Sequence, residues 1–192
     1  MPLVPMVITN EGGQERSFDI YSRLLRDRII MCQGQVEDNM ASLIVAQLLY
    51  LQSEDAKQPI HLYVNSPGGS VISGLSIIST MNLLSCPVYT YGMGQCCSMG
   101  LMIVSSGEKG YRYSLPNTRY MGHTVSSGTE GHIADMKIAV EETDRLNEIL
   151  MEMLSKNTGK DIETIKKDMD RDLFMSEDEA VAYGLIDKVL KK

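Results

Sequence analysis

The chain is poor in aromatic and in cationic residues. Among its 192 residues there is no tryptophan, there are two phenylalanines, and 18 lysines and arginines face 25 acidic residues, for a formal net charge of −7. No run of Lys or Arg exceeds two residues. This composition argues against a basic surface for nucleic acid or an anionic membrane, so we expect neither as a partner. The start of the chain shows no secretory signal and no apolar run suits a membrane span, so we expect a cytoplasmic location.

Cysteine and histidine are also scarce. The four cysteines show no Cys-x-x-Cys spacing and no accompanying cluster of the three histidines. The sequence therefore predicts reduced, buried cysteines, without a metal site. Methionine is abundant, with 14 residues, and in a chain poor in phenylalanine these are expected mainly to fill the core.

Strand-like and helix-like patterns alternate along the whole chain. This alternation predicts one α/β domain with a mostly parallel sheet and no internal linker. Expected strands cover residues 29–32, 60–65, 87–91 and 118–122, and expected helices cover 18–26, 38–51, 71–84, 98–106, 132–157, 161–169 and 176–183. Segments 65–70 and 92–97 are predicted turns, 110–117 a hairpin-like element, and 185–190 an apolar terminal segment.

Ligands of such sheets gather at the carboxyl ends of the strands. One of the turns expected there, in the stretch GMGQCCSMG at 92–100, offers three possible nucleophiles: Cys96, Cys97 and Ser98. Ser98 is placed at a helix start, where free backbone N–H groups can stabilise an oxyanion. Serine is also a good helix N-cap, so the position alone leaves a structural role open. A helix N-terminus also favours a thiolate, which keeps Cys97 as an alternative.

A hydroxyl nucleophile needs a base and a group that orients the base. His123 follows the strand TRYMG and is expected at the same sheet edge as Ser98, whereas His61 lies inside a strand. A half-buried structural histidine is the competing interpretation of His123. The segment DMDRDLF offers three carboxylates that spacing does not separate: Asp168, Asp170 and Asp172. The glycines of NSPGG at 65–69 allow backbone to approach a ligand closely.

Long segments of the chain resemble the ClpP family of self-compartmentalising serine peptidases. The resemblance covers nearly the whole length. It is carried by LVPMVI near the start, RSFDIYSRLLRDRII, GQVEDNMASLIVAQLLYL, YVNSPGGSV, GMGQCCSMG, LPNTRYMGH and RDLFMSEDEAVAYGLIDKV, in that order. It implies Ser98 as nucleophile, His123 as general base and Asp172 as the orienting acid. It also implies an oxyanion hole formed by the backbone N–H groups of Gly69 and Met99.

The resemblance further implies an architecture. The fold would be that of the crotonase superfamily, with repeated ββα units, a mostly parallel sheet and a protruding handle helix. Residues 1–192 would form one peptidase domain, with an axial segment at 1–17, a head at 18–122 and 158–192, and a handle at 123–157. Within the handle, residues 124–131 would be a strand that pairs with extended substrate.

Partners follow from the same resemblance. It implies homo-heptameric rings stacked as a tetradecamer, with Arg171 and Asp170 at the inter-ring contact. An AAA+ unfoldase of the ClpX, ClpC or ClpA type would dock at Tyr63 and His61 and feed unfolded protein substrates into the chamber. No metal or organic cofactor is expected, because the partner unfoldase consumes the ATP.

Several residues depart from the family pattern. Cys96 and Cys97 replace two small alanines before the serine, and Met121 and Gly122 replace a branched apolar residue before the histidine. These changes suggest a specialised paralogue that needs a second ClpP-type subunit in a mixed barrel. A structural ring subunit is another hypothesis, and an acyl-CoA hydratase or isomerase on the same fold is a third. The absence of Glu from turns 65–70 and 92–99 weighs against the acyl-CoA enzyme.

Overall fold

The computed structural model describes residues 3–191, which begin with a small hairpin. Strands β1 (Met6–Glu11) and β2 (Gln14–Asp19) pair antiparallel and form a sheet separate from the main one. Helix α1 (Ile20–Arg26) follows, capped by Asp19, whose side chain accepts the backbone N–H of Ser22. The axial segment expected at 1–17 therefore falls largely on this hairpin, and its first two residues lie outside the described part of the chain.

A seven-stranded sheet, mostly parallel, forms the centre of the protein. Its main path is β3 (Ile29–Gln33), β4 (Ile60–Ser66), β5 (Val88–Cys97), β6 (Arg112–Ser114) and β9 (Lys188–Val189), all paired in parallel. Strand β7 (Arg119–Gly122) pairs in parallel with the end of β5, and β8 (Leu173–Met175) pairs antiparallel with β7. The fold class expected from the sequence is confirmed.

Helices pack on the sheet through one apolar core. They are α2 (Asp38–Glu54), α3 (Val71–Leu83) and α4 (Met99–Ser105), with α6 (Ile162–Asp168) and α7 (Glu177–Tyr183) near the carboxyl end. Alternate residues of β4 are fully buried, including Leu62 and Val64, while the residues between them face the other side of the sheet. This period of two is that of a strand with one face covered. Helix α4 is buried along its whole length.

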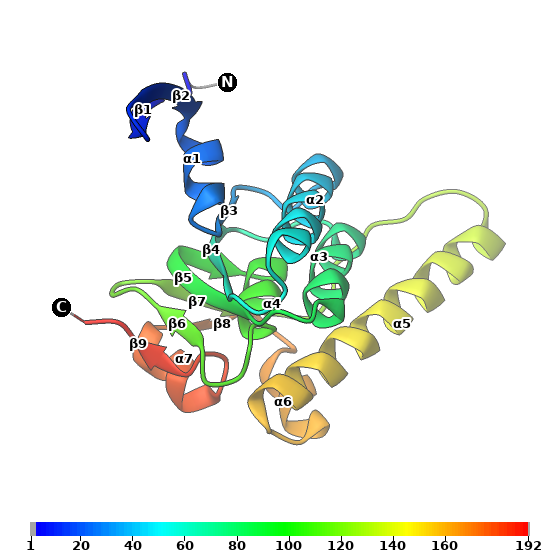
Figure 1. Cartoon of the computed structure of the whole chain (residues 1–192). Helices are drawn as coiled ribbons and strands as arrows, with labels where there is room; N and C mark the ends of the chain where they lie inside the picture. Colours follow the sequence, from blue (N-terminus) through cyan, green and yellow to red (C-terminus); the bar gives the residue numbers. More distant parts are fainter. Residues whose placement is uncertain (1–2, 192) are drawn as a thin grey trace.

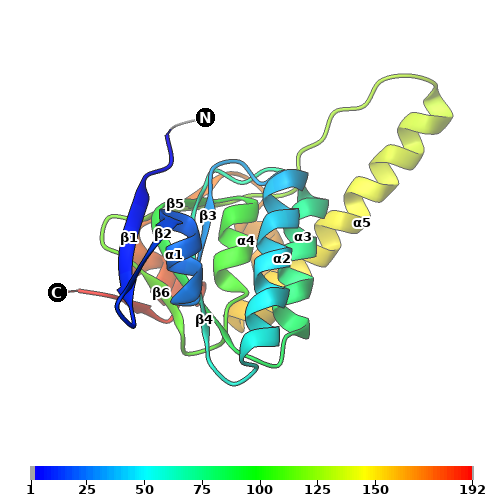
Figure 2. The same ribbon diagram turned by 45° about the horizontal axis from the view of Figure 1, so that its top comes forward.

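Helix α5 (Ile133–Thr158) extends away from the rest of the protein (Figures 1 and 2). Its C-terminal end is buried through Leu150, Met151 and Leu154, and it stops at Gly159, which adopts the left-handed conformation. The loop between β7 and α5 has no regular structure, so the strand predicted at 124–131 is wrong for the single chain. A strand needs a neighbouring strand, whereas this loop, which leads to the far end of α5 (Figure 1), makes hydrogen bonds with α5 side chains: the Val125 N–H donates to the Asn147 Oδ1, and the Ser127 and Thr143 hydroxyls lie 3.0 Å apart.

Two other predictions near the centre of the sheet are wrong. The turn expected at 92–97 is the continuation of β5, which changes partners along its length: Thr90–Gly92 pair with β6, while Gln95–Cys97 pair with β7. Gly94, with φ of +66°, lies at the change. The segment 110–117 contains β6, which pairs in parallel with β5, so it does not form a hairpin. None of the helices within residues 3–191 is both long and apolar enough to cross a membrane.

Candidate active site

Ser98 lies between the end of β5 and the first turn of α4, in an unusual backbone conformation. Its φ is +51° and its ψ is −120°, a region that side-chain-bearing residues rarely adopt. The backbone is held on both sides, because its N–H donates to the Met121 carbonyl at 2.7 Å and its carbonyl accepts from the Met102 N–H at 3.1 Å. Its hydroxyl makes no capping hydrogen bond with α4. The side chain is thus not used as an N-cap.

Gly68 packs directly against this residue. A Cβ atom on Gly68 would lie 2.6 Å from the Ser98 Cβ and 2.8 Å from the Cys97 carbonyl oxygen. Its φ of +98° is also one that glycine tolerates best. The backbone of the NSPGG segment therefore packs against Ser98 at Gly68. Any larger residue at this position would require a shift in the backbone.

His123 directly follows β7 and faces the serine. Its Nε2 atom lies 2.9 Å from the Ser98 Oγ, although 25 residues separate the two in the chain. Strand pairing explains the contact, because β7 lies beside the last residues of β5 and both strands end at the same edge. His61 lies within β4 and His132 is at the start of α5, so the structure brings only His123 to Ser98.

The three candidate aspartates differ in their surroundings. Asp172 lies just before β8, with its Oδ1 atom 3.5 Å from the His123 Nδ1 and 59% of its side chain exposed. This distance exceeds that of a charge-assisted hydrogen bond. Asp168 accepts a hydrogen bond from the Tyr183 hydroxyl at 2.9 Å. Asp170 lies 3.9 Å from Arg171, and both side chains are largely exposed.

Two backbone N–H groups next to the serine donate no hydrogen bond within residues 3–191: those of Gly69 and Met99. Met99 is the first residue of α4, where the N–H has no intrahelical acceptor. Gly69 has a φ of +150°, and a side chain there would collide with the Val36 backbone. Both N–H groups are therefore available as hydrogen-bond donors. The backbone conformation at position 69 is possible only because glycine has no side chain there.

A cavity opens beside Ser98 and His123, and apolar side chains from two helices line it together with polar groups near the serine. Helix α4 contributes Met99, Leu101 and Met102, and helix α5 contributes Leu150, Met151 and Leu154. Gly69 and Val71 from the β4–α3 connection and residues 122–126 complete the lining. The lining includes no carboxylate, whereas the hypothesis of an acyl-CoA hydratase requires glutamates for proton transfer.

Both cysteines before the serine are buried, as expected from the sequence. Cys96 is fully enclosed, with its Sγ 3.4 Å from the Val64 carbonyl oxygen, and burial raises the pKa of its thiol. Burial also raises the pKa of Cys97, although the charge of Arg119 acts in the opposite sense. Both thiols are therefore poor sources of thiolate. All four cysteines are free and buried.

The departure at Gly122 has a structural counterpart. The space beside Gly122 is filled by the side chain of Met169, and a Cβ on Gly122 would collide with the Met169 sulfur. Met169 is fully buried, and its carbonyl accepts the backbone N–H of Thr124, the residue after His123. Met169 therefore occupies the volume that a side chain at position 122 would take.

His61 and Tyr63 lie on the sheet face opposite the core, both half-buried. The parallel register places Tyr89 and Tyr91 of β5 next to them. Tyr63 stacks on Tyr91 with ring centroids 4.4 Å apart, and the His61 Nδ1 lies 2.8 Å from the Tyr91 hydroxyl. Sequence analysis missed the two tyrosines of β5, although their spacing of two in VYTY places them on one face.

Comparison with models of protein families shows which family the chain belongs to. The model of the Clp protease family matches residues 12–192, which includes every site residue described above. Because the match extends over nearly the whole chain, the chain belongs to the Clp protease family and is, at the level of that family, a ClpP-type serine protease.

Proposed function

We propose that this chain is a serine endopeptidase subunit in which Ser98 is the nucleophile and His123 the general base. The observation that carries the proposal is the 2.9 Å separation of the Ser98 Oγ and the His123 Nε2. In the first step His123 takes the hydroxyl proton while Ser98 attacks the peptide carbonyl. His123 then gives the proton to the leaving amine, and water hydrolyses the resulting acyl-enzyme by the same route.

Charge on the carbonyl oxygen has to be stabilised during the attack. The free N–H groups of Gly69 and Met99 are the donors we assign to this role. The cavity next to Ser98, which is lined by leucine and methionine side chains of α4 and α5, would take the side chain on the acyl side of the cleaved bond. The loop 124–131, which lacks a strand neighbour, would pair with extended substrate. None of these steps requires a metal or an organic cofactor.

Asp172 is the proposed orienting acid of the triad. Its carboxylate is the one of the three that contacts the imidazole, but the contact is long, at 3.5 Å, and 59% of the Asp172 side chain is exposed. Asp170 and Arg171, adjacent to it and exposed, are proposed to contact the opposite ring. A ring contact at these residues would also order the segment that carries Asp172.

Assembly into stacked heptameric rings is supported by the surface of α5. Ile133, Ile138 and Val140 are largely exposed on the projecting helix, where burial against other copies would be favourable. We further propose that an AAA+ unfoldase docks on the sheet face that carries His61 and Tyr63 and supplies unfolded proteins. ATP would be used by that partner.

A second candidate is a ring subunit that needs a Clp protease paralogue for full activity. The long and exposed contact of Asp172 with His123 is the observation that favours it. Peptide cleavage by the purified chain, alone and mixed with such a paralogue, separates the two candidates. Activity of the chain alone that is lost in Ser98→Ala supports the homo-oligomeric peptidase. Ser98-dependent activity that appears only in the mixture supports the second candidate, and cleavage unaffected by Ser98→Ala contradicts both.

A further inference from the structure

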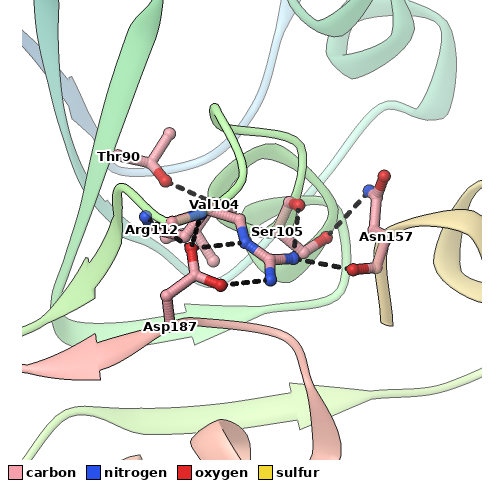
Figure 3. A network of polar contacts seen from close by, with 7 residues as sticks. Thr90, Val104, Ser105, Arg112, Asn157 and Asp187 are labelled. Atoms are coloured by element: carbon pink, nitrogen blue, oxygen red, sulfur yellow. Dashed lines mark hydrogen bonds and ion pairs between the residues drawn. The ribbon is translucent and has the colours of Figure 1, made fainter. Parts of the chain in front are cut away.

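Two walls of the cavity beside Ser98 are tied together by one buried arginine. Arg112, on β6, is 3% exposed and reaches the C-terminal ends of both α4 and α5 (Figure 3). Its Nη1 atom donates to the carbonyl oxygen of Ser105 at 3.3 Å and to that of Asn157 at 2.9 Å. These carbonyls belong to the last residue of α4 and the penultimate residue of α5.

The guanidinium is itself fixed by a carboxylate. Asp187 accepts from the Arg112 Nε at 3.0 Å and from its Nη2 at 2.6 Å, so the pair is bidentate. Asp187 also accepts the backbone N–H groups of Gly110 and Arg112. The arginine therefore has little freedom to rotate.

The position of the charge explains why an arginine is needed. The last carbonyls of a helix have no partner within the helix, and the C-terminal end carries partial negative charge. Arg112 satisfies one such carbonyl on each helix with a single cation. Two smaller contacts hold the same region: the Thr90 hydroxyl donates to the Val104 carbonyl at 2.7 Å, and the Asn157 amide donates to the Ser106 hydroxyl at 3.1 Å.

The same two helices carry the cavity walls. Helix α4 has only seven residues, or about 10 Å of length, so a shift at Ser105 moves Met102 and Met99 with it. On α5, Leu154 lies one turn before Asn157 and faces the cavity. Because packed interiors transmit small displacements, the separation of α4 and α5 at Arg112 sets the separation of the walls.

We propose that Arg112 is a positioning residue that determines which substrate side chain fits beside Ser98. The proposal rests on the proposed peptidase function of this chain. Arg112 touches neither substrate nor the reacting atoms, and it acts through the two helices that it joins. Loss of the guanidinium would let α4 and α5, which form the cavity walls, move together or apart. The preference of the cavity for large or small substrate side chains would then change.

The test compares Arg112→Met with a matched arginine elsewhere. Arg28 also donates to main-chain carbonyls, those of Leu51, Asp55, Gln58 and Pro59, but it caps the end of α2, away from the cavity. For each full-length variant, kcat and KM are measured with fluorogenic peptides that carry leucine or alanine before the cleaved bond. We expect Arg112→Met to change the leucine-to-alanine ratio of kcat/KM by about tenfold, because a change in fit of about one methylene group in a pocket alters kcat/KM by at least that factor. Arg28→Met should leave the ratio at its wild-type value.

Arg112→Lys provides a second variant should the methionine variant not fold. Lysine keeps the charge but lacks the planar fork, so we expect a change in the same direction and of smaller size. Equal ratios in wild type, Arg112→Lys and Arg28→Met would overturn the proposal. So would a ratio that changes equally in the Arg112 and Arg28 variants, because that result indicates a general loss of stability.

A readout that does not depend on cleavage separates this proposal from the proposed function. The methyl resonances of Met102 and Met151, labelled with carbon-13, report the two walls directly. We expect both to shift in Arg112→Lys and neither in Arg28→Met. Wild-type protein that cleaves no peptide, either alone or mixed with a paralogue, but that shows these shifts would contradict the peptidase function and support the positioning role. Unchanged methyl resonances would overturn the positioning role.

Discussion

The Ser98 hydroxyl and the His123 imidazole lie 2.9 Å apart at adjoining strand ends, while the Asp172 carboxylate remains 3.5 Å from the other ring nitrogen. The nucleophile and the base are thus brought together by the pairing of β5 with β7 within one chain. The third group lies on a short exposed segment before β8.

Gly68→Ala should abolish most of the activity. Its Cβ would lie 2.6 Å from the Ser98 Cβ, so the serine has to move away from His123. We expect kcat to fall by about a hundredfold or more, as for other misplaced catalytic groups. Gly34→Ala is the control, because Gly34 also has a positive φ but a Cβ there would have no neighbouring atom within 4 Å. Both variants carry a backbone cost of about 1–2 kcal/mol, so equal kcat values would contradict the proposed role of Gly68.

Asp172→Asn should lower kcat in the assembled protein with little change in KM. An amide in place of the carboxylate cannot stabilise the imidazolium that forms during the attack, and we expect about a hundredfold loss. Asp168→Asn is the matched control, because Asp168 contacts Tyr183 and not His123. If steady-state kinetics gave both variants wild-type kcat, Asp172 would not be the orienting acid.

Gly122 and Met169 should behave as a coupled pair. Gly122→Ala places a methyl group against the Met169 sulfur, which would displace either Met169 or His123. We expect Gly122→Ala alone to reduce kcat, and the additional change Met169→Ala to restore part of it by vacating the space. A double-mutant cycle on kcat/KM measures the coupling. Strictly additive effects would show that the methionine does not compensate for the glycine.

The contribution of Asp187 to stability should depend on pH. Burial acts to raise the pKa of this carboxyl, but the hydrogen bonds and charge of Arg112 outweigh burial, and the pKa lies below the ordinary value of 3.8. A lowered folded-state pKa contributes stability above the unfolded-state value, and this contribution is lost as the pH falls through the folded-state pKa. Urea unfolding of wild type and Asp187→Asn should therefore differ most near neutral pH. A difference that stays constant down to about pH 3 would contradict this account.

The sequence pattern predicts the parts of the site that depend on the order in which strands and helices follow one another along the chain. Alternating strands and helices place Ser98 and His123 at strand ends, and the parallel sheet then requires those ends to share an edge. The strand predicted at 60–65 is present, and Cys96 and Cys97 are buried as their apolar character predicts.

Features that depend on long-range packing were not predictable in this way. Whether GMGQCC turns or continues as a strand depends on β7, which offers β5 a new partner where β6 ends. Arg112 and Asp187 are 75 positions apart in the chain, and nothing in the local sequence around either residue indicates the other. The gap between His123 and Asp172 depends on how an exposed segment is ordered, which sequence spacing does not encode.

The most direct test of the central claim is to locate the covalent adduct of a peptide diphenyl phosphonate, which an activated serine hydroxyl attacks at phosphorus with loss of phenoxide. Peptide mapping by mass spectrometry is performed on wild type, Ser98→Ala, His123→Ala and Cys97→Ala. We predict one adduct per chain on Ser98, absent from Ser98→Ala, greatly slowed in His123→Ala and retained in Cys97→Ala. An adduct on Cys96 or Cys97, or labelling that persists in Ser98→Ala, would contradict the assignment of Ser98 as the nucleophile.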